Sequence, residues 1–247
     1  MKKILLNDKT IALVHKMQAE LNTSVKLSNT SKLGVKSWSL QAINTCPASI
    51  NDQGELVDAC KGCYATNGNY RFSNVRAARE FNKQAWQDEN FVNDFINELH
   101  KERFFRWFDS GDMYHIKLSE KIYQIMLETP HVKHWLPTRM YKFKKFHSII
   151  QKMQALNNVV VRLSSDYIDG TKVNTIFNQV SDNNSVIISS DSIDGYNKGF
   201  ICSAYNQNGK CLTCTACYDK SIKTIAYIGH GKAMLKNQSK LIKTVNI

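Results

Sequence analysis

The chain is poor in proline, and no segment of it is rich in serine, glycine and proline together. Its three prolines are Pro47, Pro130 and Pro137. Flexible linkers between domains usually have such a composition, so we expect the 247 residues to form a single domain. Hydrophobic residues make up 43% of the chain, which is enough to bury a core and argues against a disordered protein.

Long apolar runs are missing as well. No window reaches the roughly 18 consecutive apolar residues that a membrane-spanning helix needs. The first residues begin like a signal peptide, but Asn7, Asp8 and Lys9 interrupt the apolar run and no small-residue cleavage site follows. The sequence therefore predicts a cytoplasmic protein without a membrane partner.

Acidic residues are too few to balance the basic ones. The chain has 33 Lys and Arg against 21 Asp and Glu, a formal charge of +12. Such a charge suits nucleic acid or another polyanion, and it equally suits a solubilising surface. The basic tail (residues 231–247) is the densest candidate contact, although its helical spacing also fits a solvated face. Its lysines are Lys232, Lys236, Lys240 and Lys243.

No P-loop, dinucleotide-binding glycine motif or nucleophile elbow occurs, so cysteine dominates the search for chemistry. The seven cysteines fall into two groups. A cytoplasmic chain keeps its thiols reduced, and core cysteines would scatter along the sequence, so we predict metal ligation. We call the groups the first cysteine set (Cys46, Cys60 and Cys63) and the distal cysteine set (Cys202, Cys211, Cys214 and Cys217).

The first cysteine set reads C-x13-C-x2-C and offers three thiolates. Two thiolates at C-x2-C spacing can converge on one metal centre, and Gly62 lets the loop between them tighten. A [4Fe–4S] cluster held by three cysteines leaves one iron open to an exogenous ligand. The alternative is a zinc ion closed by a histidine from elsewhere in the chain, with five candidates: His115, His131, His134, His147 and His230.

The distal cysteine set reads C-x8-C-x2-C-x2-C and supplies four thiolates, a complete set for tetrahedral zinc or for a second cluster. Zinc ribbons usually pair two C-x2-C knuckles across a longer loop. The run here is closer to the start of a bacterial ferredoxin motif, which favours iron–sulfur and keeps zinc as the alternative.

Short apolar runs alternate with amphipathic segments, which is typical of an α/β fold with a parallel sheet. The predicted strands are 36–43, 103–108, 133–138, 158–165, 185–190 and 222–230, and the predicted helices are 74–89, 91–102, 116–127 and 141–156. We predict a partial (β/α)6 TIM-like barrel with its core over 30–200, a Cys-rich C-terminal loop over 201–220 and the basic tail.

Polar motifs follow several of the predicted strands, where parallel α/β folds place their active sites. Asp109 and Asp112 flank Ser110-Gly111 in a segment that also suits a plain turn. Asp166 and Asp191 end two later strands and suit acid/base chemistry, ribose contacts or helix caps. Arg71 and Arg76 suit anion neutralisation or an ordinary helix surface, and the four tryptophans suit core packing.

The combined pattern of WSL, TCP, CKGCYA, SGD, TR, VRLSSD and the distal cysteines, from Trp38 to His230, resembles the gene-product-88 family of phage and plasmid proteins. This resemblance implies a phage or mobile-element origin, hence the host cytoplasm, and no established activity.

The chain also resembles radical S-adenosylmethionine enzymes, in which three cysteines after the first strand of a partial barrel hold a cluster. The usual spacing there is C-x3-C-x2-C, and here the first gap is longer. The resemblance implies that Ser110, Gly111 and Asp112 meet the methionine ammonium, that Arg139 or Arg162 meets the carboxylate, and that Ser164 and Asp166 lie near the ribose, with Asp112 and Asp166 as catalytic candidates.

Three functions follow from these observations. The first is an iron–sulfur enzyme of the radical S-adenosylmethionine type that modifies a nucleotide or nucleic acid. The second is a zinc-stabilised, non-catalytic nucleic-acid-binding protein. The third is a cluster-containing regulator or host-interaction protein. The oligomeric state does not follow from the sequence.

Overall fold

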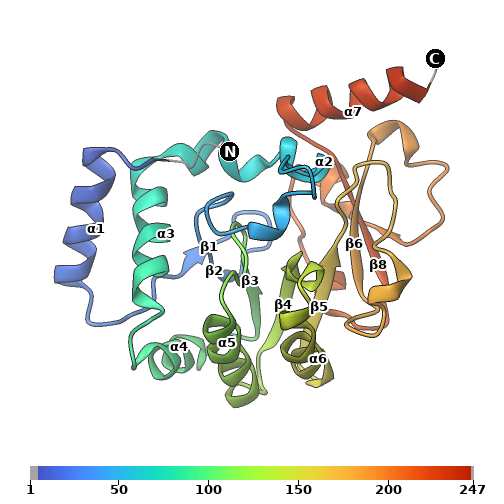
Figure 1. Ribbon diagram of the computed structural model, residues 1–247. Helices are drawn as coiled ribbons and strands as arrows, with labels where there is room; N and C mark the ends of the chain where they lie inside the picture. Colours follow the sequence, from blue (N-terminus) through green and yellow to red (C-terminus); the bar gives the residue numbers. More distant parts are fainter. Residues whose placement is uncertain (1–4, 246–247) are drawn as a thin grey trace.

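The computed structural model describes residues 5–245, with side chains described up to residue 240. Its centre is a sheet of eight strands in the order β1-β2-β3-β4-β5-β6-β8-β7 (Figure 1). The strands are β1 (Ser28–Asn29), β2 (Lys36–Trp38), β3 (Phe104–Trp107), β4 (Lys133–Thr138), β5 (Val159–Ser164), β6 (Asn184–Ile188), β7 (Phe200–Ile201) and β8 (Thr224–Ile228).

All neighbouring strands are parallel except β1, which pairs antiparallel with β2. The predicted α/β class with a parallel sheet is therefore confirmed. The sheet has eight strands instead of about six, because the two-residue strands β1 and β7 are too short to leave a sequence pattern. Among the described residues, strand pairing leaves the sheet open, so the predicted partial (β/α)6 barrel is not confirmed.

Helices cover one face of this sheet. In Figure 1, α4 (Phe91–Leu99), α5 (Ile116–Glu128) and α6 (His147–Ala155) lie in a row below the strands. Beside them, α1 (Asp8–Glu20) packs against α3 (Ser73–Ala85). The short α2 (Asp58–Lys61) and the C-terminal α7 (Lys232–Val245) lie at the upper edge of the view.

The two faces of the sheet differ in chemistry because side chains alternate along each strand. On the helix-covered face Phe105, Trp107 and Leu136 are fully buried in the main core cluster. In register on the other face stand Arg106 of β3 and Trp135 of β4, 4.6 Å apart from guanidinium carbon to ring centre. The face that lacks the helices thus carries a cation stacked on an aromatic ring at this point.

Several predicted elements differ from the observed ones at their ends. The strand expected over 36–43 stops at Trp38, since the next residues turn toward the first cysteine set. The helix expected over 141–156 begins only at His147; residues 140–146 form short 3-10 turns while Lys142 points inward to Asp166. The helix α1 was not predicted, because the first residues were considered only as a signal peptide, which their sequence did not support.

The distal loop joins the two ends of the open sheet. Cys211, which follows edge strand β7, donates its backbone N–H to the Lys32 carbonyl oxygen at 2.8 Å. The adjacent Lys210 ammonium donates to the Ser31 carbonyl oxygen, also at 2.8 Å. Residues 31–33 form the turn between β1 and β2, so a loop spans the gap that strand pairing leaves open.

Candidate metal centre at the carboxyl edge of the sheet

The first cysteine set gathers beyond the carboxyl end of β2. Cys46 lies in the loop after that strand, Cys60 lies in α2, and Cys63 follows the end of α2. The long gap between Cys46 and Cys60 folds back on itself, because Ile50 and Leu56 form an antiparallel bridge. The wide C-x13-C spacing is thus compatible with thiols that lie close together.

The three thiols of the first cysteine set share a buried environment with nearby charges. Burial raises the pKa of all three thiols. For Cys46, the charges of Asp112, Cys60 and Cys63 raise the pKa further. The Arg139 cation acts in the opposite direction on Cys60 and favours its thiolate. Within the described part of the chain, no three His, Cys, Asp or Glu side chains are already arranged as metal ligands.

The turn after β3 supports the loop that carries Cys46. Gly111 has a φ of +81°, and a Cβ there would lie 2.6 Å from Leu40 Cβ and 2.7 Å from Thr45 Oγ1. The Ser110 hydroxyl donates to the Leu40 carbonyl oxygen at 2.7 Å. Only glycine combines this backbone conformation with so close an approach, so Ser110 and Gly111 position the loop.

Asp112 connects the ends of β3 and β4. Its Oδ1 accepts from the Met113 N–H and from the Thr138 hydroxyl, each at 2.8 Å, and its Oδ2 accepts from the Arg139 N–H at 2.9 Å. Burial raises the pKa of this carboxyl to about 6, against the effect of these donors. Two carboxylate oxygens offer about four acceptor positions, so the three donors leave capacity for one more.

Asp166 holds the other side of the site. Its carboxylate accepts from Arg139 Nε at 3.2 Å and from Lys142 Nζ at 2.7 Å. Its backbone carbonyl accepts from the Ala59 N–H at 2.9 Å, which anchors α2 and therefore Cys60. The structure thus brings together Asp112, Arg139 and Asp166 beside the first cysteine set.

Arg162 lies elsewhere. This β5 residue is fully buried and donates to four backbone carbonyl oxygens of the distal loop at 2.7 to 3.1 Å. Those carbonyls belong to Ala216, Cys217, Asp219 and Ile222. The structure therefore separates Arg162 from Arg139, its alternative as carboxylate ligand. Ser164, at the end of the same strand, accepts a hydrogen bond from Ser185 at 3.3 Å.

The distal cysteine set lies in the segment between β7 and β8, near the polar face of the sheet. Burial raises the pKa of Cys211, and Cys202 and Cys214 are among the charges that raise it further. Burial also raises the pKa of Cys217 to about 11, and its sulfur lies 3.2 Å from the Tyr227 hydroxyl. The four thiols are electrostatic neighbours, as the first three are.

Lys142 is a site residue that the sequence did not reveal. Besides its ion pair with Asp166, its ammonium donates to the Ala48 carbonyl oxygen at 3.1 Å, within the loop that follows Cys46. It occurs in the segment MYKFKK beside two exposed lysines. No sequence signal distinguishes it from them, since its function depends on the tertiary position of Asp166.

A hydrogen-bond network around Asp109 was also not predicted from the sequence. Asp109 accepts from Arg106 at 2.8 Å and from the Tyr70 hydroxyl at 2.5 Å. The Tyr64 hydroxyl donates to the Asp109 backbone carbonyl at 2.7 Å. Tyr64 directly follows Cys63, so this network fixes the end of the cysteine loop against the strand β3. The motif DSGD flagged Asp109, but not its partners.

Of the five histidines considered as zinc ligands, His230 is the one beside the cysteine loop. Its ring stacks on that of Tyr64, with centroids 6.3 Å apart and an interplanar angle of 20°. The others make contacts elsewhere: His115 caps α5, His131 and His147 face backbone carbonyls, and His134 is buried against Trp107 and Thr129.

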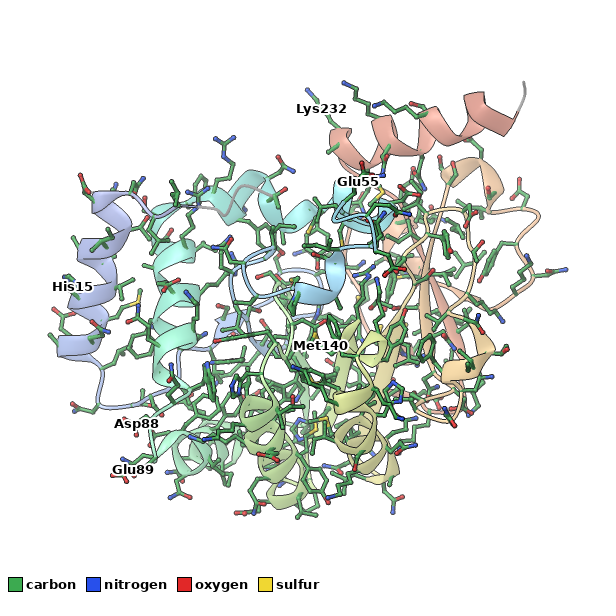
Figure 2. All side chains as sticks on the ribbon, in the orientation of Figure 1. His15, Glu55, Asp88, Glu89, Met140 and Lys232 are labelled. Atoms are coloured by element: carbon green, nitrogen blue, oxygen red, sulfur yellow. The ribbon has the colours of Figure 1, made fainter. Side chains whose placement is uncertain are left out.

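The basic tail forms α7 and packs on α2. A Cβ on Gly62 would lie 2.8 Å from Met234 Cα, and the Asn237 side chain donates to the Asp58 carbonyl oxygen at 2.8 Å. Figure 2 shows Lys232 at the start of α7, on the side turned away from the sheet. Lys236 is exposed as well, while the side chain of Lys243 lies outside the described residues.

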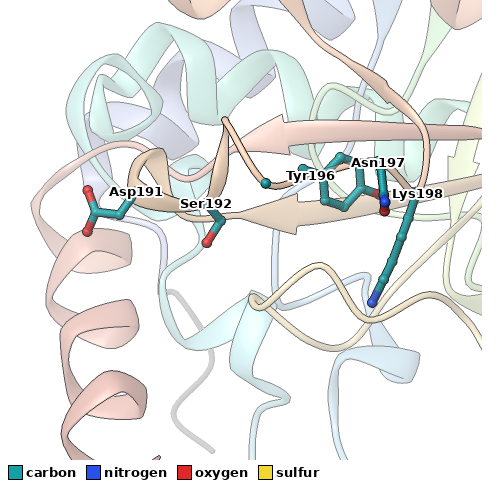
Figure 3. Close-up of a pocket in the computed structure, with 6 residues that line it drawn as sticks. Asp191, Ser192, Tyr196, Asn197 and Lys198 are labelled. Atoms are coloured by element: carbon teal, nitrogen blue, oxygen red, sulfur yellow. The ribbon is translucent and has the colours of Figure 1, made fainter.

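Two hollows of the surface lie away from the cysteines. One, of about 260 Å³, is lined by residues 191–198 after β6, with Asp191 toward one end and Lys198 toward the other (Figure 3). The second, of about 460 Å³, lies between α1, α3 and the start of α4. Neither of these two hollows is lined by a residue of the first cysteine set.

The fold and the site together define an α/β protein with a mostly parallel sheet, which has three thiols in the segment after the carboxyl end of β2 and four more between β7 and β8. The family model described as Gene product 88 matches residues 7–232, and the chain belongs to this family, as its motifs had indicated. No curated protein and no solved structure matches the chain. No helix in the described part is long and apolar enough to cross a membrane.

Proposed function

We propose that the protein binds an iron–sulfur cluster through Cys46, Cys60 and Cys63 and uses it in chemistry of the S-adenosylmethionine-dependent type. The proposal is supported by the position of Cys46, Cys60 and Cys63 in the segment that follows β2 in a mostly parallel sheet, near the strand ends that carry Asp112, Arg139 and Asp166. The carboxyl edge of the sheet is where α/β folds bind ligands, and consecutive strands β2 to β6 supply it as a partial barrel would.

The residues present fit such a group in their chemistry. Thiolates are the ligands that iron–sulfur clusters require, and the neighbouring cations of Arg139 and Lys142 favour the thiolate of Cys60. Without a bound cluster, no interaction holds the three sulfurs at ligand distances from one centre. We therefore expect the ligand geometry to form when the cluster binds. When bound, the cluster would supply one-electron chemistry and an iron with a free coordination position.

The protein side chains have separate tasks in this proposal. Asp112 has one acceptor position left, which suits the ammonium group of S-adenosylmethionine, and Arg139 suits its carboxylate. Asp166 keeps Arg139 and Lys142 oriented and anchors α2. Ser110 and Gly111 position the Cys46 loop, and Ser164 lies at the neighbouring strand end. The distal cysteine set would hold a second cluster or a zinc ion.

The test is anaerobic reconstitution with iron and sulfide, followed by metal and sulfide analysis. We expect visible iron–sulfur absorbance that decreases in Cys60→Ser. In Cys214→Ser, only the metal bound by the distal cysteine set should be lost. With dithionite as electron donor, the loaded protein should convert S-adenosylmethionine to methionine and 5′-deoxyadenosine, and Asp112→Asn should weaken this conversion. Colourless protein that carries only zinc after reconstitution would overturn the proposal.

A second candidate is a protein that binds metal and nucleic acid without catalysis. It is favoured by the fact that Asp112 and Asp166 both hold the fold together through several hydrogen bonds. It predicts full metal content and nucleic-acid binding with no turnover of S-adenosylmethionine. In either case we place the protein in the cytoplasm of a phage or plasmid host, as its family suggests.

A further inference from the structure

The segment between Asp58 and Glu80 contains no acidic residue. It includes Cys60 and Cys63, two of the three members of the first cysteine set, and continues into α3. Its arginines, Arg71, Arg76 and Arg79, alternate with aromatic and amide side chains. Arg71 ends a short 3-10 turn that packs on α3, and Arg76 and Arg79 lie in α3 itself, so three cations fall within a short segment that has no acidic residue of its own.

The aromatic side chains of this region are unusually exposed. Phe72 is 58% exposed and Tyr64 is 43% exposed. The Tyr64 ring stacks on the exposed ring of His230, and its centroid lies 5.5 Å from that of Tyr70. Exposed rings beside arginines are the elements on which unpaired bases stack.

The arginines have unused donors. Arg79 is only 7% exposed, its guanidinium lies 4.6 Å over the Tyr70 ring, and its Nε and Nη1 find no hydrogen-bond partner among the described residues. The Nε of Arg76 is likewise without a partner there. The nearby acid, Asp109, already accepts from Arg106 and Tyr70. Buried donors that lack partners are costly, so an anion that accepts from them would be stabilised.

We propose that this region, the arginine–aromatic surface (Tyr64, Arg71, Phe72, Arg76, Arg79 and His230), binds single-stranded nucleic acid. Bases stack on Phe72 and on the Tyr64–His230 pair, and phosphates accept hydrogen bonds from the arginines. A duplex offers no free base face, so single strands are preferred. This inference rests on the surface alone and holds whether or not the first cysteine set carries a cluster.

The test is fluorescence anisotropy with a labelled oligothymidylate about twelve nucleotides long. We expect Phe72→Ala to weaken binding about tenfold through the loss of one stacked base. Arg71→Ala should reduce the slope of log affinity against log salt by about 0.7, the share of one phosphate contact. Matched controls are Tyr205→Ala, a tyrosine that is 50% exposed in the distal loop, and Arg103→Ala, an exposed arginine before β3.

Arg79→Lys keeps the buried positive charge and removes most of the guanidinium donors, so it separates an effect on folding from an effect on oligonucleotide binding. We expect an unchanged far-UV spectrum and weaker binding of the oligothymidylate. The same titration on Cys60→Ser separates this inference from the cluster: iron content falls while oligonucleotide affinity stays. Unchanged affinity of Phe72→Ala, equal losses in the two controls, or equally tight binding of the matching duplex would overturn the proposal.

Discussion

His134 is a buried titratable group on the helix-covered side of the sheet. Trp107 Nε1 donates to its Nδ1 at 3.3 Å, and its Nε2 lies 2.9 Å from the Thr129 hydroxyl, which itself donates to the Ile125 carbonyl oxygen. These contacts assign the neutral ring with a proton on Nε2. Burial lowers the pKa of His134 to about 3.

This depressed pKa makes the protein sensitive to acid. Below the ordinary histidine pKa of about 6.5, His134 is protonated in the unfolded chain but stays neutral in the folded protein. The free energy of unfolding should therefore fall by about 2 kcal/mol between about pH 7 and pH 5 because of this residue alone. Urea unfolding at the two pH values measures this loss of free energy. The loss should disappear in His134→Gln and remain in His100→Gln, which replaces an exposed histidine. Equal acid losses in all three proteins would contradict the assignment.

At the scale of elements, Arg162 connects a strand to the distal loop. It lies on β5 and donates to four backbone carbonyl oxygens between residues 216 and 222. A cation that satisfies several carbonyls is a common way to fix a loop without regular structure. The distal loop in turn connects the edge strand β7 with the turn after the edge strand β1. A single side chain therefore stabilises the loop that links the two edges of the open sheet.

Arg162→Met keeps much of the volume and removes every donor. We expect the free energy of unfolding to fall by at least about 3 kcal/mol, because each partly buried carbonyl that loses its donor costs about 1–3 kcal/mol. Hydrogen exchange should become faster in residues 214–223 first. Urea denaturation with Arg103→Met as the exposed control measures the difference, and a loss no larger than the control's would show that the loop is held in another way.

The sequence predicted those elements whose pattern is local. The strand 133–138 was predicted with its observed ends, and the run NVVVRLSS identified β5 to within a residue. The neighbourhood of Asp112, Arg139 and Asp166 followed from the rule that parallel strands end at one edge. The ion pair of Lys142 and the carbonyl acceptors of Arg162 could not be predicted, because packing between distant segments brings these partners together.

At the scale of the whole molecule, the C-terminal helix packs beside the first cysteine set. The C-terminal helix α7 lies on α2, with Met234 against Gly62 and Asn237 bonded to the Asp58 carbonyl. Met234 is buried with Ala59 and Ile168 in a small separate cluster. A helix with several lysines thus packs on α2, which carries Cys60, and we expect it to limit access to that thiol.

Gly62→Ala tests this cover directly. Gly62 has no left-handed φ, so alanine costs little in the loop itself, but its Cβ would lie 2.8 Å from Met234 Cα. Overpacking of this kind costs about 1–3 kcal/mol, which should loosen α7 and speed maleimide labelling of Cys60 roughly five- to hundredfold. Gly195→Ala is the matched control, because nothing lies within 4 Å of a Cβ there. Mass-spectrometric mapping of labelled thiols reads out the site. If Cys60 labels at the control rate, α7 does not limit access to it, and its slow reaction must come from the raised pKa of the thiol alone.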